Sequence, residues 1–197
     1  MNKYFIFLLA LVFYGTGMIY SQVNAWAGAG PLYTSGFYFL NNRMESYKTT
    51  NTGVFLKGIY HISNSVHVSP SFSWILPNIY KINAVDGEEK TSVSSLMFDI
   101  NGHYVFKSSR HFNFYGLAGL DILIARRKYV STILNAEQKI VVTDNTPGLN
   151  LGAGTLILVS EKVNLFAEIK YLLSKYDQLM VNAGFMLNFQ FKGRNKK

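Results

Sequence analysis

Five charged residues lie within segments that are otherwise mostly apolar or small, and they are the first residues in this chain that could do chemistry. They are Lys57, Asp99, Asp121, Glu168 and Lys170. Carboxylates beside lysines can exchange protons with a substrate or pass them along a path. Nothing in the sequence predicts a substrate cleft, so we expect no catalytic residue and no cofactor. We favour a structural network in which Lys57 and Lys170 pair with the three carboxylates, because an unpaired buried charge costs several kcal/mol.

Three histidines form a second candidate site. His61 and His67 flank a predicted turn at 63–65 and should face each other, with His103 on the same inner rim. Converging imidazoles can hold a metal ion, but no His-x-His spacing and no carboxylate at that level supports a ligand set. We therefore expect hydrogen-bonded rim histidines and no metal site. The absence of cysteine excludes disulfides, cysteine-based zinc sites and a thiol nucleophile.

The stretch Gln178–Phe191 shows most clearly which elements position these side chains. Its residues separate at every second position into an apolar row and a polar or small row, and a period of two predicts a β-strand. Its 14 residues exceed the typical strand of about 5–6 and suffice for a tilted membrane-crossing strand, which needs about 9–11. The apolar row consists of Leu179, Val181, Ala183, Phe185, Leu187, Phe189 and Phe191.

Seven earlier segments have the same period. They are 23–33 (with a possible continuation through 36–40), 54–62, 66–76, 96–106, 112–124, 149–159 and 163–171. Short turns at 63–65, 107–111 and 160–162 alternate with predicted loops at 41–51, 77–90 and 126–146. Within the last loop, 129–134 and 138–143 could instead extend the flanking strands as a hairpin. The connection at 174–176 is short where a long one would be expected. Short turns at one rim and long loops at the other are typical of a membrane barrel.

The position of charge decides between a membrane barrel and a water-soluble one. All five strand charges lie on the face opposite the apolar row, whereas a soluble barrel would place apolar residues inside and charges outside. We therefore predict an all-β fold: an eight-stranded antiparallel up-and-down transmembrane β-barrel, preceded by a cleavable signal peptide. Eight strands enclose a space that side chains fill, so we expect a polar core without an aqueous channel.

The tight turns predict which residues are neighbours across the ladder. If Val159 faces Val163, Glu168 lies opposite Gly154 and Lys170 lies opposite Gly152. If Phe106 faces Phe112, Asp99 lies opposite Gly119. Glycines beside charged neighbours leave volume for long side chains and permit strand curvature.

The N-terminus has the order of a secretory signal. A short basic start is followed by the apolar run 5–13 and a small residue, Ser21, before Gln22. We expect cleavage there rather than an anchoring helix, which gives a signal peptide at 1–21, a barrel at 22–191 and a basic C-terminal tail at 192–197. The net charge of +8 is dispersed, and without a basic face that carries interleaved aromatics we expect no nucleic-acid partner.

The pattern resembles the small eight-stranded outer-membrane β-barrel family, of which the OmpA membrane domain is the familiar member. The resemblance covers 23–191. Its most specific motif is Asn182-x-Gly184-x-x-Leu187-x-Phe189, similar to the C-terminal signal that the family's assembly machinery reads, although here 192–197 follow it. The resemblance implies the outer membrane of a Gram-negative-type cell, contact with outer-membrane lipid, and the envelope assembly machinery as a partner during biogenesis. We expect a monomer.

The leading functional hypothesis is a non-enzymatic outer-membrane barrel with a structural or surface-contact role. One alternative is a lipid-modifying enzyme, since some barrels that resemble this one act on lipopolysaccharide. Such an enzyme would need a His/Ser or His/Asp arrangement at the loop-bearing rim, but His61, His67, His103 and His111 all fall at the short-turn rim. A second alternative is an accessory subunit of an envelope secretion machine.

Overall fold

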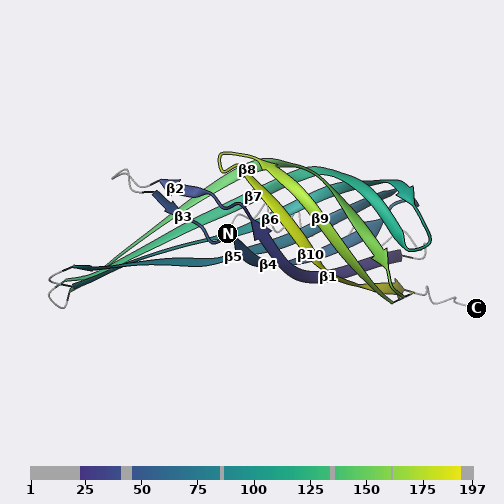
Figure 1. The fold of residues 1–197 in the computed structure, drawn as a ribbon. Helices are drawn as coiled ribbons and strands as arrows, with labels where there is room; N and C mark the ends of the chain where they lie inside the picture. The colour runs from purple at the N-terminus through teal and green to yellow at the C-terminus, as the bar shows by residue number, and fades with distance from the viewer. Residues whose placement is uncertain (1–22, 41–45, 85–86, 134–135, 161, 192–197) are drawn as a thin grey trace, which may run out of the picture.

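The computed structural model of the chain is a closed β-barrel of eight antiparallel strands with a small two-stranded hairpin at one end (Figure 1). The structure describes residues 23–40, 46–84, 87–133, 136–160 and 162–191. The barrel order is β1-β10-β9-β8-β7-β6-β5-β4, closed by pairing of β4 with β1. The barrel strands are β1 (Val23–Thr34), β4 (Thr52–His61), β5 (Val66–Ala84), β6 (Gly87–Ser108), β7 (Phe112–Ile133), β8 (Ala136–Leu158), β9 (Val163–Leu173) and β10 (Gln178–Phe191).

The two faces of the strands separate as the alternation predicts. Along β9, buried and exposed residues alternate without a break. Lys57, Asp99 and Glu168 are at most 5% exposed and lie inside the barrel, whereas Phe185 and Leu187 are 50% and 41% exposed on its outer wall. A wall of exposed apolar side chains around a charged interior is stable in lipid and not in water. The predicted fold class is confirmed.

Four neighbouring strands, β5 to β8, continue well beyond the rest of the barrel at the loop-bearing rim (Figure 1). The predicted loop at 77–90 is therefore wrong. β5 runs to Ala84 and β6 starts at Gly87, so the two strands pair almost to their connection. At 126–146 the hairpin alternative is the correct one. Backbone hydrogen bonds to neighbouring strands hold these segments extended whatever the polarity of their side chains.

The predicted loop at 41–51 carries a hairpin of its own, β2 (Tyr38–Leu40) paired with β3 (Ser46–Lys48). Gly36, at a φ of 71°, separates it from β1, so the first strand does not continue through 36–40. This left-handed conformation favours glycine because it lacks a Cβ. The hairpin contacts β5, since the Tyr80 hydroxyl donates to the Lys48 carbonyl over 2.7 Å.

The predicted register is right for one hairpin and wrong for another. Glu168 pairs with Gly154, and Lys170 pairs with Gly152, as predicted. Asp99, however, pairs with Asp121 rather than Gly119. The predicted Phe106–Phe112 pair would centre the turn on residue 109, whereas the observed Ser108–Asn113 pair centres it between residues 110 and 111. In addition, a bulge between Val105 and Lys107 adds a residue to β6. The first effect lies in the turn and the second in β6 close to it, and alternation along a strand predicts neither.

Two predicted segments, the signal peptide at 1–21 and the tail at 192–197, lie outside the described residues. Within the described part of the chain, no helix is long and apolar enough to cross a bilayer.

Candidate functional site

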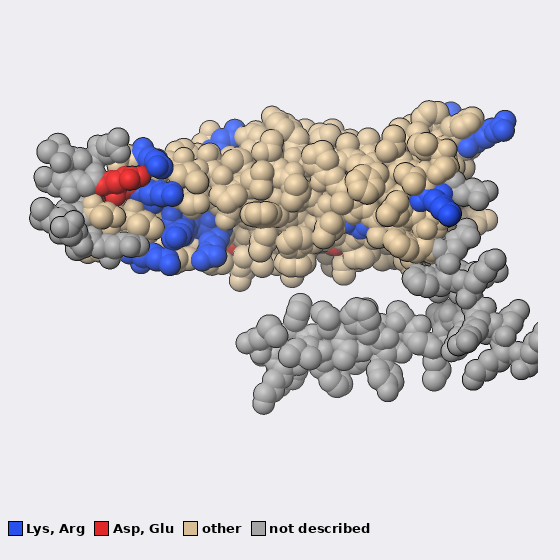
Figure 2. All heavy atoms as spheres, turned by 90° about the horizontal axis from the view of Figure 1, so that it is seen from below, with Lys and Arg blue, Asp and Glu red and all other residues tan. Residues whose placement is uncertain are grey.

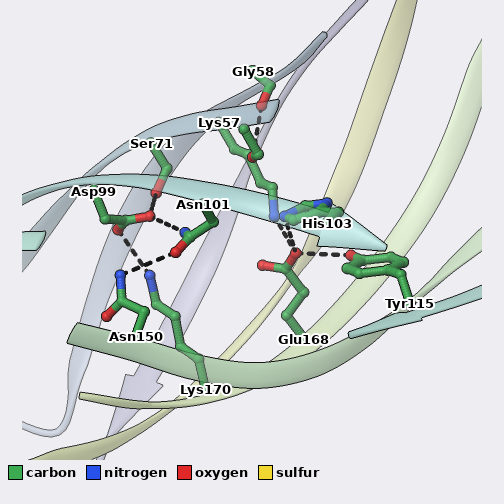
Figure 3. A network of polar contacts seen from close by, with 11 residues as sticks. Lys57, Gly58, Ser71, Asp99, Asn101, His103, Tyr115, Asn150, Glu168 and Lys170 are labelled. Atoms are coloured by element: carbon green, nitrogen blue, oxygen red, sulfur yellow. Dashed lines mark hydrogen bonds and ion pairs between the residues drawn. The ribbon is translucent and has the colours of Figure 1, made fainter. Parts of the chain in front are cut away.

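The first half of the charged interior is centred on Glu168. The Lys57 ammonium on β4 donates a hydrogen bond to Glu168 Oε1 on β9, and the Tyr115 hydroxyl on β7 donates to the same oxygen over 2.8 Å. His103 Nε2 lies 3.8 Å from it. Its ring stacks on Tyr115, with centroids 4.6 Å apart. Because β4 and β9 are not neighbours in the barrel, the Lys57–Glu168 contact spans the lumen (Figure 3).

The second half is centred on Asp99 and lies nearer the loop-bearing rim. Lys170 Nζ donates to Asp99 Oδ2 over 2.8 Å, and the Ser71 hydroxyl donates to Oδ1 over 2.7 Å. The Asn101 amide donates to the same oxygen and accepts a 3.1 Å hydrogen bond from Asn150. β6 and β9 are also non-adjacent, so this group spans the lumen a second time (Figure 3).

Two glycines on β8 make room for these long side chains. A Cβ added at Gly154 would lie 2.7 Å from both Glu168 Cγ and the Tyr115 hydroxyl. A Cβ added at Gly152 would lie 2.9 Å from Lys170 Cβ and 2.3 Å from a backbone oxygen of β9. Both separations are shorter than carbon atoms tolerate, so the ion pairs need glycine on the facing strand.

Asp121 does not form the predicted ion pair with a lumenal lysine. It is 3% exposed, and neither carboxylate oxygen has a hydrogen-bond partner within the described residues. The register places it beside Asp99, which already has Lys170. The lumenal set therefore contains three carboxylates and two ammonium groups, Lys57 and Lys170.

The predicted rim histidines are neighbours, but the hydrogen bonding expected of His103 is wrong. His103 lies beside the Glu168 carboxylate, and neither of its ring nitrogens has a hydrogen-bond partner within the described residues. His61 pairs with His67, their ring centroids are 4.1 Å apart, and His67 pairs in turn with His103. Trp26 from β1 packs edge-on against His61 with centroids 4.7 Å apart. No group of three or more His, Asp or Glu suited to a metal ion occurs in the part of the chain that the structure describes.

An apolar layer lies on the loop-bearing side of the charges. Met97, Leu123 and Leu172 are each two residues along their strands from Asp99, Asp121 and Lys170. Together with Ile75 and Met180 they are fully buried. Nearer the loops, Phe37 stacks on Tyr176 with ring centroids 4.5 Å apart. The interior is thus filled by apolar side chains as well as by the ion pairs.

A polar contact ties the β9–β10 turn to β8 above this layer. The Lys175 ammonium and the Tyr176 hydroxyl each donate to Asp144 Oδ2 over 2.6 Å. These two hydrogen bonds, that of Lys175 first, hold the pKa of Asp144 below its ordinary value of 3.8. Partial burial raises the pKa of the Tyr176 hydroxyl.

Four network members were not identified as such from the sequence: Ser71, Asn101, Tyr115 and Asn150. Each lies on the inward row of its strand, so alternation gives its face. Alternation does not give the partner of each side chain across the lumen, because that partner depends on register and strand order. Tyr115 is the most consequential, because its hydroxyl supplies a second hydrogen bond to Glu168.

The residues of the C-terminal motif lie on both faces of β10. Asn182 is buried in the lumen, whereas Leu187 and Phe189 are exposed on the outer wall. Gly184 lies against β1, where an added Cβ would be 2.2 Å from the Ala29 carbonyl oxygen. The motif therefore contributes to the β1–β10 closure of the barrel.

The arrangement fills and braces the barrel. The two lumenal ion pairs, Lys57–Glu168 and Lys170–Asp99, each join non-adjacent strands, so they restrain the cross-section of the barrel in a way that ladder hydrogen bonds do not. Glu168 is held by Lys57 and Tyr115 and is only 4% exposed, which does not suit a residue that must exchange protons with a substrate.

Comparisons with known proteins agree with this architecture. A family model described as "Outer membrane protein beta-barrel domain" matches residues 6–191. The solved structure of Ail, the attachment invasion locus protein of Yersinia pestis, is similar with a TM-score of 0.50 at 14% identity, over 87% of this chain and 100% of that one. OprG from Pseudomonas aeruginosa gives a TM-score of 0.54 at 12% identity, over 86% and 97%. At these identities the two structures show the fold alone.

The comparison with curated proteins found no match. The family match nevertheless spans every strand of the barrel, and it confirms the resemblance and the location that the alternation, the charge inversion and the C-terminal motif indicated. The chain therefore belongs to the outer membrane protein beta-barrel domain family and is an integral protein of the outer membrane.

Proposed function

We propose that this protein is a non-enzymatic outer-membrane barrel with a side-chain-filled interior, which serves the structure of the envelope or contacts at the cell surface. The observation that carries the proposal is the double bridging of the lumen by Lys57–Glu168 and Lys170–Asp99. A water-filled pore would need these side chains to lie along the wall and leave the axis open.

The apolar layer supports the same proposal. Ions cross a narrow pore only where polar groups or water replace their hydration shell. Met97, Leu123 and Leu172 offer no such group, and they lie directly beside the ion pairs. An ion entering from the loop-bearing rim would meet Phe37 and Tyr176 first and this layer next.

The positions of the histidines argue against the lipid-modifying alternative. Acyl groups and phosphates of the outer leaflet would lie near the loop-bearing rim, which faces the cell exterior. The chain has four histidines. His61, His67 and His103 lie at the opposite, short-turn end, and His111 is exposed in a turn there.

Surface contact is the role that the projecting strands favour. β5 to β8 carry a four-stranded sheet well past the barrel wall. Such a sheet is long enough to stand clear of the headgroups and present side chains to the outside. We propose that the protein acts there as a monomer, after insertion by the envelope assembly machinery that reads the motif at Asn182, Gly184, Leu187 and Phe189.

Two measurements test the proposal. The purified full-length protein in a planar lipid bilayer should give no steady current above the bare bilayer, whereas a stable conductance would contradict a filled interior. Lipid A from cells that make the protein should have the same mass spectrum as lipid A from cells that lack it. A modification lost on exchange of a histidine for alanine would establish the enzyme instead.

A further inference from the structure

The outer face of the projecting sheet carries an unusual row of cations. Lys81 on β5 pairs with Lys90 on β6, Lys90 pairs with Val130 on β7, and Val130 pairs with Lys139 on β8. Three of the four residues across this row are lysines, all exposed. Like charges directly opposite one another on a sheet destabilise it, unless an anion lies between them.

Two further cations lie between this row and the barrel on the same face. Arg126 on β7 pairs with Ser94 and Thr143, and Lys128, two residues farther out, pairs with Ser92 and Val141. Lys128 and Arg126 therefore lie one and two rows inward of Val130, respectively. Together the five residues, Lys81, Lys90, Arg126, Lys128 and Lys139, form what we call the basic band.

The basic band has one acidic neighbour among the described side chains. Lys81 Nζ lies 3.4 Å from Glu88 Oε1, and both side chains are more than half exposed. Among the described side chains on this face of β5 to β8, Glu88 is the only acidic one outward of the barrel. Figure 2 shows Lys and Arg gathered near this end, while the middle of the wall in that view is almost free of charge.

The depth of the band relative to the membrane indicates its ligand. Trp74, exposed on the outer wall, pairs with Leu96, which pairs with Ile124. Tryptophan at the end of an apolar wall marks the membrane interface. Arg126 follows one row farther out. Successive rows are about 6.7 Å apart along a strand, or about 5 Å along the membrane normal at the usual tilt. The band therefore begins at the depth of the lipid headgroups, ~5 Å outside the hydrocarbon, and extends outward to ~15 Å.

We propose that the basic band binds the phosphate groups of outer-leaflet glycolipids, with Lys90, Lys128 and Lys139 as its principal contacts. Arg126 lies nearest to the acyl chains, and Glu88 partly neutralises the charge of Lys81. The positive charges most available to a phosphate are therefore those of the other three lysines. Phosphates between Lys81, Lys90 and Lys139 would also relieve the repulsion within the lysine row. The inference rests on the outer-membrane location and is independent of whether the lumen conducts.

The test uses fluorescently labelled lipid A that carries two phosphates, held in neutral detergent micelles and titrated with the folded full-length protein. Fluorescence anisotropy gives the affinity. The test variant combines Lys90→Gln, Lys128→Gln and Lys139→Gln. The matched control combines Lys107→Gln, Arg110→Gln and Lys162→Gln, which removes the same charge from exposed positions at the opposite rim. Heat-modifiable gel mobility verifies that both variants fold.

The test variant should bind roughly a hundredfold more weakly, since each lysine near an anionic lipid surface contributes about a factor of five. The control should bind like the parent, and added salt should weaken parental binding. Lipid A without phosphates should bind the parent as weakly as the variant binds the phosphorylated form. Equal binding by variant and control, or no effect of removing the phosphates, would overturn the proposal. So would lysine-dependent binding of a soluble sulfated polysaccharide without any binding of lipid A.

Discussion

Asp121 lies directly across the β6–β7 ladder from Asp99, so two buried carboxylates are neighbours while Lys170 contacts only one of them, 2.8 Å from Asp99 Oδ2. Asp121 has no hydrogen-bond partner within the described residues. Asp99, in contrast, accepts hydrogen bonds from Ser71, Asn101 and Lys170. The two carboxylates are paired across the ladder, but only Asp99 has a counterion, so we expect their removal to have opposite effects on the stability of the barrel.

Asp121→Asn should stabilise the barrel by about 1–2 kcal/mol, because it removes a buried charge that lacks a partner and keeps the side-chain shape. Asp99→Asn should instead destabilise it by about 3–5 kcal/mol, since Lys170 would lose its counterion. Urea unfolding in detergent, followed by gel mobility, measures both. Destabilisation by Asp121→Asn would mean that Asp121 has a favourable interaction in the folded state.

The Lys57–Glu168 pair should behave as a unit. Lys57→Met leaves Glu168 buried without its cation and should cost about 3–5 kcal/mol. Adding Glu168→Gln to Lys57→Met should restore most of this loss, because the remaining amide can still accept from Tyr115. Urea unfolding of the two single variants and the double variant gives the coupling energy. Strictly additive effects would contradict a direct contact.

Gly154 and Gly116 provide a matched pair of glycines on adjacent strands. Gly154→Ala should destabilise by about 1–3 kcal/mol, because its Cβ would press on Glu168 and Tyr115. Gly116→Ala should change stability little, since nothing lies within 4 Å of its added Cβ. Thermal unfolding followed by heat-modifiable gel mobility compares them. Similar losses at both positions would point to strand curvature rather than lumenal crowding.

The Asp144 contact at the outer rim should be lost only in acid. Its pKa is lowered in the folded state by hydrogen bonds from Lys175 and Tyr176, so the contact is fully formed above the ordinary pKa of 3.8 and is lost as the pH falls through the lower, folded value. Hydrogen exchange of 174–177, corrected for intrinsic rates, should be slower in the parent than in Asp144→Asn at pH ~6, and this difference should disappear as the pH falls below the lowered pKa of Asp144. A difference that persists in acid would contradict this account.

Depth in the membrane should decide the cost of a charge on the outer wall. Phe185, 50% exposed near the middle of β10, should cost about 2–4 kcal/mol when changed to Arg. Leu179 is 42% exposed near the start of the same strand, at the loop-bearing rim, and Leu179→Arg should cost about 0–1 kcal/mol. Unfolding from lipid vesicles measures both. Equal costs would contradict the assignment of this face to lipid.

The sequence by itself determined the architecture and the face of each side chain. A strand directs successive side chains to opposite sides, so the rows in 178–191 and 163–171 assign Phe185 and Leu187 to the wall and Glu168 and Lys170 to the lumen without knowledge of any neighbour. Together with the length of the segments and the alternating turns, this sufficed for an eight-stranded membrane barrel. It also sufficed for the Gly152–Lys170 and Gly154–Glu168 pairs, because a tight turn carries register directly into the strands it joins.

Only the tertiary structure decided which lumenal groups meet. The Lys57–Glu168 and Lys170–Asp99 contacts join strands that are distant in the barrel order, and the pairing of Asp99 with Asp121 follows from the turn and bulge of a single hairpin. The basic band likewise arises from alignment of β5, β6, β7 and β8, whose outer ends are predicted as loops from their polar sequence. Local alternation reports which side a residue faces, whereas register and closure depend on backbone pairing between strands that the pattern of one strand does not encode.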